Sequence, residues 1–533
     1  MSPDAASLAA SRPDPLYVEL EARILDRDQK GASEVYYRLV KDGRPLAEML
    51  REAVRIHGPY THVPYHERID DGYVNFVNND HCLLSARATL HLSNMLPGAA
   101  SGLPMAQTIW YIPTGLDIWN QKIGKAPGHY SRGLQVPDGP PPAPVVHWPD
   151  QEPLPLEGRL QERLGRWMTL VHRGQVVDAY RVFLGLMANP AERRATLAEL
   201  VFAGLIDVQD RSFQNRSYTT GHKSFRARAT VELGEAIGWG NAHAVLYAGA
   251  LDIAVGPRWY SLYEVACNAV TVYLEDQALH AVPYGGTTEQ ERALLGNKAP
   301  LGKAESDALI EVVLRQPEPG YLVKVTELLK AGKDPRSLLD ALQIGAAEVV
   351  LETHSELNFS LPQHCYEYLN TLGWFWDTFE HPQRIKLLYL AAAYLNQNAF
   401  HQKLTGDLLP PRIEKPANVA AFDADRLAGT VEAATLALDA PKAVGWTQAY
   451  LDSGHDRALL VRTLALAASR LGNDPHNQEI ALCLLEDYAK NRNPDRDRLL
   501  LAAAQHTARH RKYGDPLDCS RRFGKALGIE ALA

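Results

Sequence analysis

Cysteine is scarce in this 533-residue chain, which holds five cysteines at widely separated positions and no Cys-x-x-Cys pair. That spacing argues against a disulfide framework or an all-cysteine metal site, and it is typical of a reducing compartment such as the cytoplasm. Long apolar runs are also lacking. No stretch approaches the roughly 20 apolar residues that span a bilayer, and residues 1–15 lack the apolar segment of a secretory signal. The sequence therefore predicts a cytoplasmic protein without a membrane segment.

An excess of basic charge is absent as well. Lysine and arginine number 55 against 63 aspartates and glutamates, which gives a net charge of −8. A nucleic-acid-binding protein usually carries a basic face, so the composition argues against such a partner. Two short basic clusters, Lys223 with Arg226 and Arg228 and a second one at 509–512, are typical of solvated helix faces.

Several catalytic and nucleotide-binding motifs do not occur. The chain has no Gly-x-Gly-x-x-Gly opening a helix and no phosphate-binding Gly-x4-Gly-Lys-Ser/Thr loop. It has no His-Glu-x-x-His, no Gly-x-Ser-x-Gly elbow and no cysteine–histidine pairs of a Rieske cluster. These absences leave no local signature of nucleotide binding, of a zinc protease or of a serine hydrolase.

Apolar residues recur at helical spacing over 15–57 and again from 157 to the end, with short connectors rich in Gly, Pro, Asn and Asp. Residues 58–150 are irregular and aromatic-rich, with one helix expected near 81–95, and a Pro-rich run follows at 137–144. We predict an all-α fold of antiparallel helix pairs in a solenoid-like or bundled body. The expected divisions are 1–156, 157–350 and 351–533.

Histidine, by contrast, is abundant, with 19 residues. Four histidines share one local design, in which a turn or capping residue precedes a histidine that begins an apolar helix: His81, His222, His364 and His476. The partial positive charge of a helix N-terminus disfavours a protonated imidazole, and neutral imidazole is the form that binds metal. Four such histidines on separate helices could meet in one site for Fe(II), Zn, Cu or Ni. The alternative is that each is structural.

Other histidines are weaker candidates. His243 and His354 are reserve ligands. The pair His62 and His66 spans Pro64, which argues against the helix that would align them. The pair His506 and His510 lies on a basic late helix without a nearby acidic ligand, which is typical of a surface face.

The irregular segment is dense in side chains that orient small molecules by hydrogen bonding and stacking. We expect Tyr65, Asn79 and Trp110 to line a substrate pocket, although a packed loop anchored by its aromatic residues is the alternative. Asp80 and Glu367 are placed to orient the metal ligands.

Three segments carry a resemblance to a known family: 221–239, 363–370 and 475–486. They resemble the histidine-headed helices of the questin oxidase-like family, and also the helical region attached to some Rieske-type ferredoxin proteins. The resemblance spans roughly 200–490 and implies an all-helical oxygenase. It also implies one non-haem iron, held by histidines on separate helices with a carboxylated lysine nearby. The implied lysine position, seven residues after the last histidine, holds Cys483 here, which implies an altered metal site or another activity.

These observations predict a metal-dependent oxidoreductase, a non-haem iron oxygenase that acts on a small organic molecule. His81, His222, His364 and His476 would bind Fe(II) or another divalent transition metal. The alternative is a non-catalytic helical scaffold or an electron-transfer protein with a ferredoxin-type redox partner and structural histidines. The catalytic residues, the substrate and the oligomeric state remain open.

Overall fold

The computed structural model describes residues 14–58, 78–115, 151–208, 221–241, 249–250, 253–254, 260–274, 289–354, 360–404, 406, 408–411, 413–414, 416–417, 419–472, 474–510 and 514–532. Within these ranges the regular secondary structure is helical, and the only β-type pairing is two isolated bridges, Ala299–Lys333 and Thr353–Leu408. The predicted all-α class is therefore confirmed. In the described part of the chain, no helix has both the length and the apolar character that crossing a membrane requires.

The α-helices of the described ranges are short to medium in length and follow one another closely. They are α1 (Pro15–Leu25), α2 (Gln29–Lys41), α3 (Leu46–His57), α4 (Asn78–Met95), α5 (Leu103–Gly115), α6 (Leu160–His172), α7 (Val176–Met187), α8 (Pro190–Leu205), α9 (His222–Ile237), α11 (Ser261–Tyr273), α12 (Glu289–Leu294), α13 (Lys303–Arg315), α14 (Gly320–Lys330), α15 (Pro335–Glu352), α16 (Ser360–Thr378), α17 (Arg384–Leu404), α18 (Ala424–Leu436), α19 (Ala440–Asp452), α20 (Arg457–Arg470), α21 (His476–Lys490), α22 (Asp497–Arg509) and α23 (Asp518–Leu527). Short 3₁₀ turns lie at Gly98–Gly102, Trp239–Asn241, Val419–Ala421 and Glu530–Leu532.

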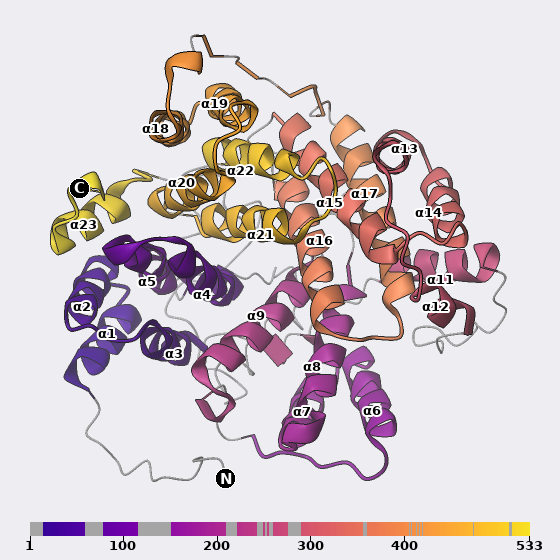
Figure 1. Ribbon diagram of the computed structural model, residues 1–533. Coiled ribbons are helices and arrows are strands. Elements are labelled where there is room, and N and C mark those ends of the chain that lie inside the picture. The colour runs from indigo at the N-terminus through magenta and orange to yellow at the C-terminus, as the bar shows by residue number, and fades with distance from the viewer. Residues whose placement is uncertain are drawn as a thin grey trace.

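Four helices form a closed ring in the middle of the molecule. α4 packs against α9, α9 against α16, α16 against α21, and α21 against α4, and Figure 1 shows them around the centre. Their residues come from all three predicted divisions of the chain, and those divisions stay a prediction. The contact between α4 and α21, which are almost 400 residues apart, gives a bundled rather than a purely sequential arrangement.

The N-terminal part contains a helix in a segment whose sequence predicts irregular structure. α5 occupies 103–115 within the segment expected to be irregular. Pro104 falls in its first turn, where a missing N–H costs nothing, and Pro113 lies near its end. Packing of α5 against α4 and α2 stabilises the helix despite the second proline.

The start of α9 depends on a glycine. Gly221 has φ +109°, in the left-handed region that side chains rarely adopt, and a Cβ there would overlap the ring of Phe225. The chain therefore turns sharply at Gly221, and His222 becomes the first residue of the helix.

Candidate metal centre

The four predicted histidines lie together at one end of the central ring of helices. The ring centroids are 5.3 Å apart for His81 and His222, 4.7 Å for His222 and His364, 5.2 Å for His364 and His476, and 4.4 Å for His476 and His81. All four side chains are buried. Each ring thus contacts two others, and the closed circuit of rings follows the circuit of helices. We call these four residues the histidine cluster.

The local structure places each ring at the same end of its helix. His222 and His476 are the first residues of α9 and α21, His81 is the fourth residue of α4, and His364 is the fifth residue of α16. The helices meet again further along, where residues six to ten positions after these histidines contact one another. All four helices therefore run away from the cluster in the same direction. The four helix N-termini therefore point at the histidine cluster.

Two carboxylates fix the orientation of two cluster histidines. His476 Nδ1 lies 2.7 Å from Asp474 Oδ1, and His81 Nδ1 lies 3.0 Å from Glu479 Oε2. Burial alone would raise the pKa of Asp474, but the adjacent His476 and His510 outweigh it and hold that pKa well below its usual range. The ionised carboxylate can only accept, so His476 Nδ1 carries a proton and donates to it.

The remaining nitrogens have the spacing of metal ligands. His476 Nε2 is 3.4 Å from His364 Nε2. Two nitrogens bound to one tetrahedral metal at roughly 2.0–2.1 Å lie about 3.4 Å apart. Ligand atoms of His81, His476 and Glu479 also lie within 4.8 Å of one another. Imidazoles held at Nδ1 by a carboxylate, with Nε2 free to coordinate, are the usual arrangement around protein-bound metals. A divalent transition metal could be held by His81, His476 and Glu479, or by Asp474, His476 and His510; among the described residues no such group includes His222 or His364.

His506 and His510 form a second, outer group of histidines, and their interpretation as a surface face is wrong. His506 is fully buried and His510 is 9% exposed. The amide of Gln363 donates to Nδ1 of both, at 3.1 and 2.7 Å. His506 Nε2 in turn donates to the carbonyl of His476 at 2.9 Å, and His510 Nε2 lies 3.3 Å from Asp474. The acidic partner of His510 is Asp474, which lies in the segment before α21.

We expect Asp474→Asn to weaken metal binding by about 10- to 100-fold, since loss of a partner that orients a ligand typically has that effect. The neutral amide is a poorer acceptor for His476 Nδ1 and does not hold the imidazole in one tautomer. Competition with a chromophoric chelator measures the affinity. Asp495→Asn, at the surface beside Lys303, is the matched control. Equal affinities for the two variants would mean that Asp474 does not position His476.

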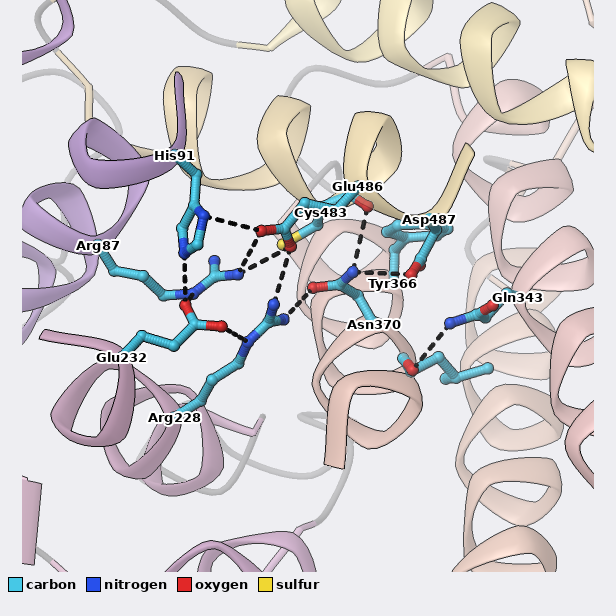
Figure 2. Close-up of polar contacts among 11 residues, drawn as sticks. Arg87, His91, Arg228, Glu232, Gln343, Tyr366, Asn370, Cys483, Glu486 and Asp487 are labelled. Atoms are coloured by element: carbon cyan, nitrogen blue, oxygen red, sulfur yellow. Dashed lines mark hydrogen bonds and ion pairs between the residues drawn. The ribbon is translucent and has the colours of Figure 1, made fainter. Parts of the chain in front are cut away.

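A layer of charged residues lies next to the histidine cluster. Arg228, which was expected on a solvated helix face, is buried in this layer. Glu486 accepts from Arg87 at 2.8 Å and from Arg228 at 2.9 Å, and Glu232 accepts from the same two arginines. Figure 2 shows Glu486 and Glu232 flanking the two guanidinium groups. Lys223 is likewise buried and paired with Asp207. Glu232 lies four residues after Arg228 in α9, whereas Glu486 and Asp207 come from other segments, which the local sequence does not reveal.

The sequence contains a signal for this layer that went unused. The segments beginning at His81 and His222 both read His-x4-Ala-Arg-Ala-Thr, and those beginning at His364 and His476 both read His-x-x-Glu. The first pattern places an arginine at the same depth in α4 and in α9. The second places Glu367 and Glu479 one turn behind their histidines. Shared spacing across helices is what a layered bundle requires.

Asp487 extends the layer towards α16. Its carboxylate accepts from Tyr366 at 2.8 Å and from Asn370 at 2.9 Å, and Asn370 also accepts from Arg228 (Figure 2). Burial raises the pKa of Asp487 to about 6, although both hydrogen bonds act in the opposite direction. The ionised form of Asp487 therefore destabilises the folded protein.

We expect the difference in stability between the parent and Asp487→Asn to depend on pH. The pKa of Asp487 in the folded protein, about 6, lies above the ordinary value of 3.8. The stabilising contribution of protonated Asp487 to the folded protein is therefore fully present below pH 4. It is lost as pH rises through 6, for a total of about 3 kcal/mol. The variant does not titrate there and should gain on the parent by that amount between pH 4 and 7. Urea unfolding at both pH values measures it, and a constant difference would contradict it.

The buried carboxyl group of Glu367 has a raised pKa. It is 3% exposed, and its Oε2 has no hydrogen-bond partner among the described residues. Burial and the neighbouring Glu479 raise its pKa to about 8, against the opposing influence of His476, His81 and Arg87. Cys483, at the implied lysine position, is fully buried beside it, and burial raises the pKa of its thiol well above the usual value.

The remaining predicted residues are placed as follows. Trp110 lies on α5, partly buried, with the guanidinium of Arg522 4.2 Å from its ring centroid. His354 follows α15, and its carbonyl accepts from Arg509. Asn79 and Asp80 are in the first turn of α4, but their side chains lie outside the described residues. So do Tyr65, His243, His62 and His66, and their roles stay predictions.

The sequence-level resemblance can be compared with what is known of other proteins. No family model, curated protein or solved structure matches this chain. Membership of the questin oxidase-like family therefore stays a prediction. Only the geometry of the described residues bears on the function.

Proposed function

We propose that the chain is a metal-dependent oxidoreductase, a non-haem iron oxygenase that acts on a small organic molecule. His81, His222, His364 and His476 would hold one divalent metal, with Fe(II) the preferred occupant. The observation that carries the proposal is the circuit of four buried imidazole rings, each contacting two others, at the common end of four helices.

The balance of buried charge supports a cation at this place. The two arginines behind the cluster are matched by Glu232 and Glu486. Asp474 and Glu479 lie against His476 and His81, and Glu367 lies nearby with a pKa raised to about 8 by burial and by Glu479. A buried group of carboxylates is costly unless a cation or a proton compensates it. A divalent ion among the histidines would supply that compensation.

The residues of the chain have defined roles under this proposal. Asp474 and Glu479 orient His476 and His81, and Glu367 is positioned to hold a proton near the cluster at neutral pH. The apolar packing of the four helices excludes water from the imidazoles. When bound, the metal would supply redox chemistry at positions open to dioxygen and substrate.

A non-catalytic scaffold is the second candidate, and one observation favours it. His506 and His510 are buried, and Gln363, Asp474 and a backbone carbonyl hold them without a metal. The fold therefore accommodates histidines as structural residues a few ångströms from the cluster.

Elemental analysis of protein purified without a histidine tag tests the proposal. We expect about one iron per chain and dioxygen uptake that disappears when a chelator removes the iron and returns when Fe(II) is restored. Stoichiometric zinc without redox activity would keep the metal centre and overturn the oxygenase. Absence of any metal, with normal helical circular dichroism and no uptake of added Fe(II), would favour the scaffold.

A further inference from the structure

One buried side-chain amide connects the outer histidines to the histidine cluster. Gln363 is fully buried and directly precedes His364 near the start of α16. Its side-chain nitrogen lies 3.1 Å from Nδ1 of His506 and 2.7 Å from Nδ1 of His510. A single carboxamide therefore contacts both outer imidazoles, which lie four residues apart at the end of α22.

The other ring nitrogens of these two imidazoles face groups that can only accept a hydrogen bond. His506 Nε2 lies 2.9 Å from the backbone carbonyl of His476. His510 Nε2 lies 3.3 Å from Oδ1 of Asp474, a carboxylate that is ionised because its pKa is held well below the usual range by the adjacent histidines. Both Nε2 atoms therefore carry a proton.

The amide of Gln363 is then the donor to both imidazoles. The same amide atom contacts both Nδ1 atoms, so both rings are neutral if that atom is the nitrogen and both are charged if it is the oxygen. The two ring centroids lie 5.4 Å apart, and two buried like charges at that separation repel each other. The neutral arrangement, in which the nitrogen donates one N–H to each imidazole, is therefore favoured.

The two outer imidazoles in turn hold the start of α21. His510 shares Asp474 Oδ1 with the backbone N–H and with Nδ1 of His476, which lie 2.9 and 2.7 Å from that oxygen. His506 donates to the backbone carbonyl of His476. The carboxylate that orients His476 and the backbone that carries its ring are thus both held by rings that one glutamine orients.

We propose that Gln363 is a positioning residue, which acts through His506 and His510 to hold the imidazole of His476 in the orientation that binds metal. Gln363 also adjoins His364, whose Nε2 lies 3.4 Å from His476 Nε2, so one amide couples two of the proposed ligands. The effect on metal binding rests on the proposed function. The tautomers of the outer histidines and the hold on His476 do not depend on a metal.

Nitrogen-15 NMR of the metal-free protein, labelled at its histidine rings, tests this arrangement. We expect His506 and His510 to give the signals of neutral rings protonated at Nε2 alone. Gln363→Glu places an acceptor where the parent has a donor, so Nδ1 of both rings should gain a proton. Signals of two charged rings in the parent would overturn the proposal, and so would signals that are unchanged in Gln363→Glu.

Binding of Zn²⁺, measured by competition with a chromophoric chelator, tests the effect on the metal centre. Gln363→Met is similar in size but donates no hydrogen bond. It should weaken Zn²⁺ binding about tenfold, at the lower end for loss of an outer partner, and speed the exchange of the His476 Nδ1–H with water. Gln505→Met is the matched control, because Gln505 is a buried glutamine of α22 whose amide donates to the carbonyl of Thr353. It should leave both quantities unchanged.

The two measurements separate the role of Gln363 from the existence of the metal centre. Equal Zn²⁺ affinities of the parent and Gln363→Met would overturn the positioning role, and so would equal exchange rates of the His476 Nδ1–H. A parent that binds no Zn²⁺ would overturn the metal centre. The exchange rate would then decide alone whether Gln363 holds the ring of His476, with faster exchange in Gln363→Met as the supporting result.

Discussion

We expect the double variant His222→Ala/His364→Ala to lose bound metal while it keeps its helices. His364 Nε2 lies 3.4 Å from His476 Nε2, and the ring of His222 lies between those of His81 and His364 in the circuit. Removal of two of four neutral donors should lower the metal affinity by more than about 100-fold, beyond the effect of an outer-sphere change. Elemental analysis measures the loss, and circular dichroism checks the helices.

His381→Ala is the control for that variant. His381 is also a buried histidine, but it stacks on Phe202 and pairs with Glu199, away from the cluster. Its replacement should leave the metal content unchanged. Equal metal content in the parent and in the double variant would show that the four histidines are not ligands, whatever metal the protein contains.

Glu486→Gln produces the largest expected loss of stability. Glu486 bridges Arg87 and Arg228, which are 5% and 2% exposed, and the amide keeps its size but not its charge. Removal of one partner from a buried ion pair costs about 3–5 kcal/mol, because the remaining charges are left in a medium of low polarity. The free energy of unfolding in urea at pH 7 measures the loss.

The same variant has a predictable dependence on pH. Burial opposes ionisation, yet the two arginines lower the pKa of Glu486 to about 2 from its ordinary 4.5. Its stabilisation is present above pH 4.5 and is lost as pH falls through 2, so the difference from the parent should shrink in acid. Asp307→Asn breaks an exposed pair with Lys303 and should change stability by less than about 1 kcal/mol. Similar effects for the two variants would contradict a structural role for the buried layer.

The fold class and the starts of the four central helices could be predicted because their causes are local. Gly221 and Pro475 are the residues directly before α9 and α21, and the apolar spacing after each of them indicates a helix. The same local signals predict His81, His222, His364 and His476 at helix starts. They could not show that the starts meet, since the contacts join residues up to 398 positions apart.

The residues wrongly predicted to be exposed have partners that lie far away in the sequence. His510 was assigned to the surface because no acidic residue lies near it in the sequence, but Asp474 reaches it from another element. The sequence near Arg228 shows only Glu232, a spacing typical of an exposed helix pair, while the buried partner Glu486 lies 258 residues away. Charge and polarity indicate exposure only when partners are local, and a buried ionic layer violates that assumption.

The wide spacing of the cluster residues along the chain has a consequence for the biosynthesis of the protein. A ribosome that has made 400 residues has supplied His81, His222 and His364, but neither His476 nor the carboxylates that orient it and His81. Under the proposed function, the full set of ligands is therefore present only near the end of translation. If the cluster binds a metal as proposed, the ion would join a nearly complete chain rather than a nascent segment, and its binding would stabilise the finished fold.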